Sequence, residues 1–255
     1  MQKAGIIGCG WLGLSLAKYL ISKSYHINGT STSAERFIEL REANINPFVF
    51  NLGERISDEF LEYLDFLIIC FPISKKHSED KYLNFIQDLS HQINEKTKVI
   101  FTSSISVYIQ NQLIADEANG ILDKTSINFI VEEMLQKQLK NDLTILRLGG
   151  LISENRHPIH FLAGKTNIEN GNAPINLVHR EDVIQLIWSI ISESKFNEIF
   201  NCVYPFHPSK NSYYKKVAKE RNFTPPSFVE NQLNHKIVDG QKAAKKLEFR
   251  YNFQP

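Results

Sequence analysis

Short apolar runs alternate with stretches of helical periodicity along most of the chain. Each run is short enough for one buried strand, and the stretches between them repeat apolar residues every three or four positions, as one face of a helix does. The runs lie at residues 4–7, 25–29, 48–51, 66–70, 99–102 and 144–148. This alternation predicts a doubly wound α/β fold, whose mostly parallel strands are joined by right-handed crossovers.

Two helices near the middle of the chain have the clearest apolar faces, at residues 79–93 and 126–140. The first face comprises Tyr82, Leu83, Phe85, Ile86 and Leu89, and the second comprises Ile127, Ile130, Val131, Met134, Leu135 and Leu139. Helices of this kind cover a sheet with one stripe of side chains. Ligands of parallel sheets bind beyond the carboxyl ends of the strands, so the residues that follow each strand are the candidate site residues.

The first apolar run ends in the sequence Gly-Cys-Gly-Trp-Leu-Gly, in which Gly8, Gly10 and Gly13 have the spacing of a dinucleotide-binding turn. Such a turn needs one glycine for the tight bend, one for the approach of a pyrophosphate and one for close packing of helix against strand. Trp11 and Leu12 begin the helix, whose N–H groups favour negative charge. The pattern predicts a Rossmann-type nucleotide site, with a glycine-rich turn of another α/β protein as the alternative.

The residues after the second strand favour NADP over NAD. An NAD site usually places an acid about 20 residues beyond the glycines, where this chain has Thr30, Ser31 and Thr32, followed by Arg36. These hydroxyls and the guanidinium suit the 2′-phosphate of NADP. A structural alternative explains part of the pattern, because Thr32 and Glu35 have the spacing of a capping box.

The ends of two later strands add candidates for contact with the cofactor, by the same rule that ligands lie beyond the strand ends. They are Cys70, Phe71, Pro72, Thr102 and Ser103. The three cysteines of the chain are far apart and without Cys-x-x-Cys spacing, which predicts neither a disulfide framework nor a metal site. Packing is therefore the expected role of their thiols.

From residue 101 the chain reads Phe-Thr-Ser-Ser-Ile-Ser-Val-Tyr, and this segment resembles the end of the fifth strand in the extended short-chain dehydrogenase/reductases, the sugar-nucleotide epimerases and dehydratases. The resemblance continues through residues 146–151, 176–183 and 200–203 and covers nearly the whole chain. It implies that Ser104 is the catalytic serine, which hydrogen-bonds the reacting carbonyl or hydroxyl of a small-molecule substrate. It also implies a small C-terminal substrate lobe.

The chain departs from this family at the catalytic dyad. Family enzymes carry a Tyr-x-x-x-Lys pair one helix later, where the lysine lowers the pKa of the tyrosine that exchanges a proton with substrate. Alignment by spacing from Ser104 puts Phe129 and Glu133 in these places, and an alternative register puts Thr125 and Phe129 there. The chain is therefore identified as an atypical member of the extended family that lacks the dyad.

Two functional hypotheses follow from this departure. In the first, the protein is an NADP-dependent oxidoreductase or epimerase-like enzyme, because hydride transfer belongs to the nicotinamide and the protein must position substrate and manage one proton. Tyr108, His160 or His179 would exchange that proton, and Arg156, His160 and Asn176 would contact substrate. Three of these residues have a structural alternative: Tyr108 as a packing residue, His179 as a structural imidazole and Arg156 as an ordinary exposed arginine.

In the second hypothesis the protein binds NADP without turning it over and acts as a redox sensor or regulatory scaffold, which the missing dyad supports. A structural protein without any ligand is the least favoured class, because it leaves the three glycines and the Ser-Ser run unexplained. The retained C-terminal lobe argues for a small molecule that still enters the protein. A homodimer through the two mid-chain helices is left open.

Length and composition limit the domain organisation, the partners and the location that these hypotheses allow. The 255 residues, 42% of them hydrophobic, suffice for one large α/β domain with a small lobe. We expect an NAD(P)-binding Rossmann domain at residues 1–150, and a mixed region at residues 151–255 that completes the sheet and forms the substrate lobe. With 29 basic and 28 acidic residues the net charge is +1, which predicts no nucleic-acid partner. No apolar run approaches the length of a membrane span, so a cytoplasmic location is expected.

Overall fold

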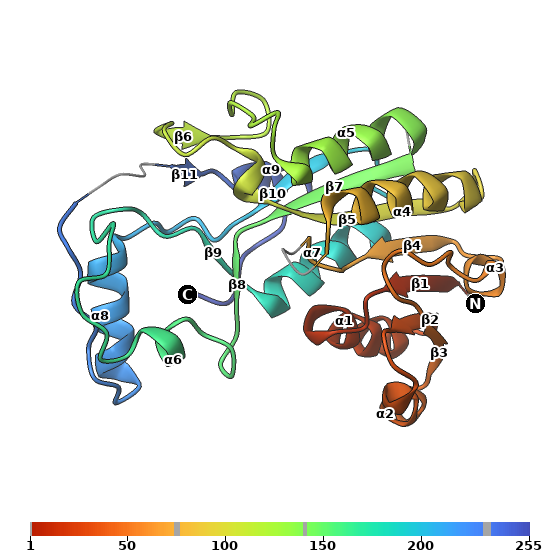
Figure 1. Ribbon diagram of the computed structural model, residues 1–255, viewed down its shortest axis with the longest axis horizontal. Helices are drawn as coiled ribbons and strands as arrows, with labels where there is room; N and C mark the ends of the chain where they lie inside the picture. The colour runs from red at the N-terminus through yellow and green to blue at the C-terminus, as the bar shows by residue number, and fades with distance from the viewer. Residues whose placement is uncertain (1, 74–76, 140–141, 232–235) are drawn as a thin grey trace. The chain divides into compact units, whose positions relative to one another are not determined.

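The computed structural model describes residues 2–73, 77–139, 142–231 and 236–255 (Figure 1). The chain divides into two compact units, each built from separate segments. Unit 1 comprises residues 1–104, 124–147 and 187–199, and unit 2 comprises residues 105–123, 148–186 and 200–255.

A seven-stranded sheet has the order β10-β7-β5-β4-β1-β2-β3. Its strands are β1 (Lys3–Ile7), β2 (His26–Ser31), β3 (Ile45–Val49), β4 (Phe66–Ile69), β5 (Lys98–Ser104), β7 (Leu143–Leu148) and β10 (Ile199–Cys202). The pairs β1–β2, β2–β3, β1–β4 and β4–β5 are parallel. The order reverses between β1 and β4, so the sequence prediction of a doubly wound, mostly parallel sheet is confirmed.

Helices cover both faces of this sheet, which explains why β4 and β7 are buried along their whole length. In unit 1, α4 (Glu79–Gln92) and α5 (Ile127–Leu139) lie side by side on one face, and α1 (Trp11–Ser22) lies on the other (Figure 1). Tyr82, Phe85, Ile86 and Leu89 of α4 are buried, as their spacing predicts. The remaining helical segments at the edge of unit 1 are η1 (Ala34–Arg36), α2 (Phe37–Glu42) and α3 (Asp58–Leu61).

One predicted strand boundary is wrong. The third strand was expected at residues 48–51, but β3 begins at the buried Ile45 and ends at Val49. Asn44, with φ +59°, ends the preceding helix and lets the strand start directly. Pro47 lies inside β3, which is tolerated because β3 is the last strand of the sheet and Pro lacks only the N–H that an edge strand can spare.

Unit 2 contains two small parallel strand pairs and several short helices. β8 (Gly150–Ile152) pairs with β9 (Leu177–His179), and β6 (Ile114–Ala115) pairs with β11 (Ile237–Val238). The helical segments are η2 (Ile105–Val107), α6 (Ile159–Leu162), α8 (Lys210–Glu220) and α9 (Gln241–Lys246), and α7 (Arg180–Ser192) begins in this unit. A buried cluster that includes Ile159, Leu177, Tyr213 and Tyr214 joins α6, β9 and α8.

Among the described residues, the structure has no helix that is both long and apolar enough to cross a membrane.

Candidate nucleotide-binding site

The glycine turn after β1 is fixed by β2. Gly8 has φ +96°, a left-handed conformation that glycine adopts without strain. Its N–H donates to the Thr30 hydroxyl at 2.8 Å, and the Cys9 N–H donates to the Thr30 carbonyl at 2.9 Å. Thr30 is buried and so has a definite structural role in holding the turn. Its predicted contact with the cofactor stays a prediction.

The two later glycines face different surroundings. A Cβ atom on Gly13 would lie 2.2 Å from the Gly8 carbonyl oxygen, so this position cannot hold a larger residue without moving the turn. A Cβ atom on Gly10 would meet nothing within 4 Å. Packing within the protein therefore explains the absence of a side chain at Gly13 but not at Gly10. Open space at the second glycine is what the approach of a pyrophosphate requires.

The first turn of α1 suits an anion. Gly10 is the N-cap residue and offers no side chain to the free N–H groups, and no acidic residue lies in the first turn, which begins with Trp11 and Leu12. The N–H groups and the helix dipole both favour negative charge at such a position. The residues present therefore fit the diphosphate of a dinucleotide.

Arg36 lies beside this turn, which the sequence alone did not establish. Its Nη1 donates to the Cys9 carbonyl at 3.0 Å, and its Nε and Nη2 donate to Glu39 Oε2 at 3.0 and 2.8 Å. Cys9 is one residue from Gly10, so the guanidinium is held next to the glycine turn by a backbone contact across 27 positions of sequence. The sequence prediction missed Glu39, although its spacing of three residues from Arg36 was a usable signal.

The predicted capping box after β2 does not form. Ser33, rather than Thr32, is the N-cap residue of η1, and it makes no side-chain capping bond. The Ser33 hydroxyl donates instead to the Glu35 carboxylate, and this bond lowers the pKa of Glu35. Ser31 is buried, and its hydroxyl accepts a hydrogen bond from the Ser33 N–H at 3.4 Å. The hydroxyl-rich segment is thus folded mainly by local bonds.

The residues after β4 are also near the turn. A Cβ atom on Gly8 would lie 3.2 Å from the Phe71 nitrogen, so this backbone directly abuts the glycine turn. The Phe71 ring stacks on Tyr82, whose hydroxyl donates to the Pro72 carbonyl at 3.3 Å. Burial raises the pKa values of Cys9 and Cys70 to about 12, so both thiols are neutral and unreactive at ordinary pH.

Of the candidates at the end of β5, Ser103 has its side chain in the protein core. Its hydroxyl donates to Glu132 Oε1 at 2.5 Å, and Arg147 Nη2 donates to Glu132 Oε2 at 2.7 Å. The side chains of Arg147 and Glu132 are only 4% and 1% exposed. The Thr102 hydroxyl donates to the Ile69 carbonyl at 3.0 Å. Sequence reasoning missed this buried ion pair, although an arginine within an apolar strand was a signal for it.

Within unit 2, Tyr108 is a core residue. It is 1% exposed, and its hydroxyl donates to Asn201 Oδ1 at 2.9 Å. Its carbonyl accepts from the Lys236 ammonium at 2.8 Å, and the same ammonium donates to the Ile105 carbonyl at 3.0 Å. These contacts favour the packing role that was the alternative for Tyr108. Ser104 is half-buried and ends β5 directly before Ile105.

Two further candidates in unit 2 also make structural contacts. Asn176 Nδ2 donates to the Lys236 carbonyl and its Oδ1 accepts from the Val238 N–H, both at 2.8 Å, so this side chain fixes the strand β11. The His179 ring stacks on Phe253 with 4.6 Å between ring centroids, and its Nδ1 accepts from the Glu181 N–H. Burial lowers the pKa of His179 and so favours the neutral ring.

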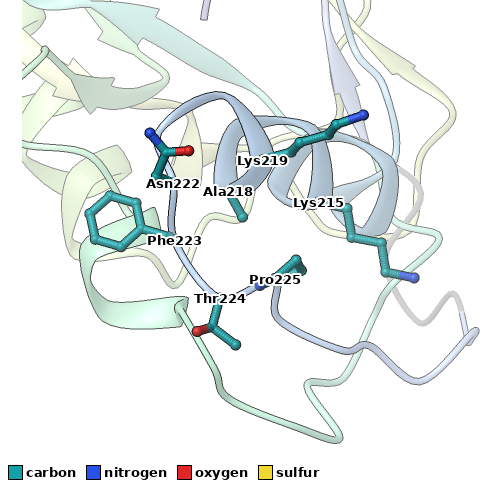
Figure 2. A pocket seen from close by; sticks show the side chains of 7 residues that line it. All are labelled: Lys215, Ala218, Lys219, Asn222, Phe223, Thr224 and Pro225. Carbon is teal, nitrogen blue, oxygen red and sulfur yellow. The ribbon is translucent and has the colours of Figure 1, made fainter.

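Arg156 and His160 are the exposed candidates. Arg156 closes a short turn with Ser153, and His160 makes an edge contact with Phe223. A hollow of about 620 Å³ lies in this unit beside α8 and the turn that follows it, and Phe223, which His160 contacts, is part of its lining (Figure 2). It is lined by Lys215, Ala218, Lys219, Asn222, Phe223, Thr224 and Pro225. None of the predicted site residues lines this hollow.

No known family profile matches the chain. A curated relative does: the chain is 33% identical to the protein YeeZ of Escherichia coli K12 over 271 aligned positions, which cover 99% of this chain and 97% of the relative. YeeZ of Escherichia coli O157:H7 matches with the same values.

Solved structures with the same fold include enzymes of the short-chain dehydrogenase/reductase type. UDP-glucuronic acid 4-epimerase from Bacillus cereus, in complex with NAD, superposes with a TM-score of 0.77 at 17% identity and covers 99% of this chain and 92% of its own. Vestitone reductase from alfalfa (Medicago sativa) gives a TM-score of 0.78 at 14% identity, with 100% and 94% covered. At such identities the likeness establishes the fold.

Proposed function

The chain belongs to the family of the protein YeeZ and has the fold of NAD-binding short-chain dehydrogenase/reductases and epimerases, and from this premise we propose that it is an NADP-dependent oxidoreductase or epimerase-like enzyme. Its substrate is a small carbonyl or hydroxyl compound, with a sugar nucleotide as the first class to test. The cofactor lies across the glycine turn, with its diphosphate at the start of α1 and its adenosine 2′-phosphate at Arg36.

The observation that carries this proposal is the open space at Gly10. Position 10 has a glycine although the folded protein leaves room for a side chain there, and the first turn of α1 carries no acid. A ligand with negative charge explains both facts at once. The guanidinium of Arg36, held against the Cys9 carbonyl, adds the positive charge that a 2′-phosphate requires.

In this proposal the residues bind and orient, while the bound nicotinamide supplies the hydride acceptor or donor. Ser104, at the end of β5, donates a hydrogen bond to the reacting oxygen of the substrate and so holds the substrate carbon for hydride transfer. Cys70, Phe71, Pro72 and Thr102 line the cofactor from the neighbouring strand ends. The proton donor is a group other than a Tyr-x-x-x-Lys dyad.

A second candidate function is nucleotide binding without turnover. The observation that favours it is the structural use of two of the three proposed proton donors: the Tyr108 hydroxyl is bonded to Asn201 inside the core, and the His179 ring is stacked on Phe253. A protein that binds NADP and reports its redox state would need the glycine turn and Arg36 but no proton donor. Cytoplasmic location and homodimer formation stay predictions under either function.

Gly10→Val is the sharpest test of nucleotide binding. A Cβ atom at position 10 would meet nothing within 4 Å in the folded protein, and a valine side chain there would occupy the space proposed for the diphosphate. Gly10 is the N-cap residue of α1 and valine is a weaker N-cap residue than glycine, so we expect Gly10→Val to lower the melting temperature only slightly and to lose NADPH binding, measured by nicotinamide fluorescence and calorimetry. Gly13→Val is the matched variant: its side chain would collide with the Gly8 carbonyl, so it should lower the melting temperature itself. Tight NADPH binding by a folded Gly10→Val would contradict the site.

Ser104→Ala separates the two functions. A panel of aldehydes, ketones and UDP-sugars is incubated with wild-type protein and NADPH or NADP, and the absorbance of NADPH and the sugar products are followed. The enzyme proposal predicts turnover with a member of the panel and its collapse, by about a hundredfold or more, in Ser104→Ala. Nucleotide binding with no turnover across the panel supports the second function. Undiminished turnover in Ser104→Ala contradicts the role of the serine.

A further inference from the structure

Arg36 is held on two sides by the protein. A guanidinium carries five N–H donors in a fixed plane. One donor, on Nη1, goes to the Cys9 carbonyl, and two donors, on Nε and Nη2, go to the single oxygen Oε2 of Glu39. These three bonds fix the position of the group beside the glycine turn and also the rotation of its plane. The Arg36 side chain is 37% exposed, so these bonds rather than close packing hold it in place.

Three occupied donors leave two, one on Nη1 and one on Nη2, that make no bond to any residue in the described part of the chain. A phosphate dianion accepts two parallel N–H bonds from the two terminal nitrogens of an arginine. The protein therefore occupies the Nε side of the guanidinium and leaves one donor on each terminal nitrogen, and these two donors can bond to a phosphate.

We propose that Glu39 is a positioning residue that sets cofactor specificity: it orients Arg36 so that the guanidinium selects a nucleotide with a 2′-phosphate. The inference rests on the proposed function, since it concerns the same nucleotide site. Glu39 does not contact the ligand itself. Its bonds already restrict the rotation of the Arg36 side chain before the nucleotide binds. Less conformational entropy is therefore lost when the phosphate binds.

The negative charge of Glu39 has the opposite effect, because a carboxylate near a phosphate dianion weakens the attraction to Arg36. Glu39 is 49% exposed, and water screens its repulsion of a group that lies beyond the guanidinium. The two bonds to Arg36 act at contact distance, where screening by water is weaker. Orientation is therefore expected to outweigh repulsion, and the two effects can be separated by substitution.

The experiment measures 2′,5′-ADP and 5′-AMP by calorimetry, because these fragments differ in the 2′-phosphate and test the subsite without any turnover. Glu39→Ala should weaken 2′,5′-ADP binding by about three- to fivefold, the upper range for an exposed ion pair, and leave 5′-AMP unchanged. Glu39→Gln keeps an acceptor oxygen for Arg36 without the charge, so it should bind 2′,5′-ADP at least as tightly as wild type. Glu42→Ala, which removes one negative charge from the same helix, is the matched control.

Each outcome decides the proposal. If both Glu39 variants bind 2′,5′-ADP more tightly than wild type, Glu39 only repels the phosphate and the positioning role is wrong. If Glu39→Ala weakens both fragments equally, or neither, Glu39 does not read the 2′-phosphate and the proposal also fails. Failure of the proposed function looks different: wild-type protein then binds neither fragment nor NADPH.

Discussion

At the residue scale, polar side chains that the sequence marks as catalytic or substrate-binding candidates hold unit 2 together. Tyr108 bonds to Asn201, 93 positions away, and Asn176 bonds to the backbone at Lys236 and Val238, some 60 positions away. A strand-end position and a polar side chain predict that a residue is near a site. They do not predict whether a distant segment of the chain has already taken its hydrogen bonds.

Lys236 gives a residue-scale prediction that follows from its burial. Its ammonium is bonded to two carbonyl oxygens, and burial lowers its pKa from 10.5 to about 8. Between pH 8 and 10.5 the unfolded chain keeps the proton that the folded protein has lost, so the free energy of unfolding should rise with pH in this window. Lys236→Met should lack this rise, which is worth about 1–2 kcal/mol between pH 7.5 and 9.5.

Urea unfolding of both proteins at several pH values measures the difference. Lys165→Met is the control, because Lys165 is exposed and its removal should leave the pH dependence of wild type intact. If the free energies of unfolding of wild type and Lys236→Met change with pH in parallel, the prediction for Lys236 is contradicted.

At the element scale, the ion pair between Glu132 and Arg147 fastens α5 to β7, and Ser103 adds β5 to the same cluster. Both charges are almost fully buried, so each needs the other to remain ionised at an acceptable cost. The cluster lies one residue before Ser104 on β5 and therefore fixes the strand end that carries this candidate catalytic residue.

Arg147→Met should destabilise the protein by about 3–5 kcal/mol, because it leaves the Glu132 carboxylate buried without its partner. The double variant Glu132→Leu with Arg147→Met should recover most of that loss, since it removes both charges. Chemical denaturation measures all three proteins. Arg55→Met is the control: it breaks an exposed pair with Asp58 and should cost less than about 1 kcal/mol. Equal losses in Arg147→Met and Arg55→Met would contradict this account.

The elements themselves were predictable from the sequence because their signals are local. The apolar faces of α4 and α5 and the buried run of β4 each repeat with the period of the structure they form. The third strand was misplaced because Pro47 argues against a strand unless it lies at a sheet edge, and edge position depends on the order of all strands. Glu132 was similarly hidden, because its burial depends on Arg147 from another element.

At the scale of the whole molecule, the glycine turn is the place where the sequence pattern and the structure agree in most detail. The turn has a left-handed Gly8, a packed Gly13 and an open Gly10, and β2 holds it through Thr30. In unit 2, Tyr108, Asn176 and His179 make contacts with structural partners. The central claim is therefore the nucleotide site, and turnover depends on it.

A crystal structure of the protein grown with NADPH tests this claim most directly. The account predicts electron density for the diphosphate against the first turn of α1 above Gly10, and for the 2′-phosphate on the terminal nitrogens of Arg36. A glycine turn without nucleotide at saturating NADPH, or a nucleotide bound elsewhere on the protein, would contradict it.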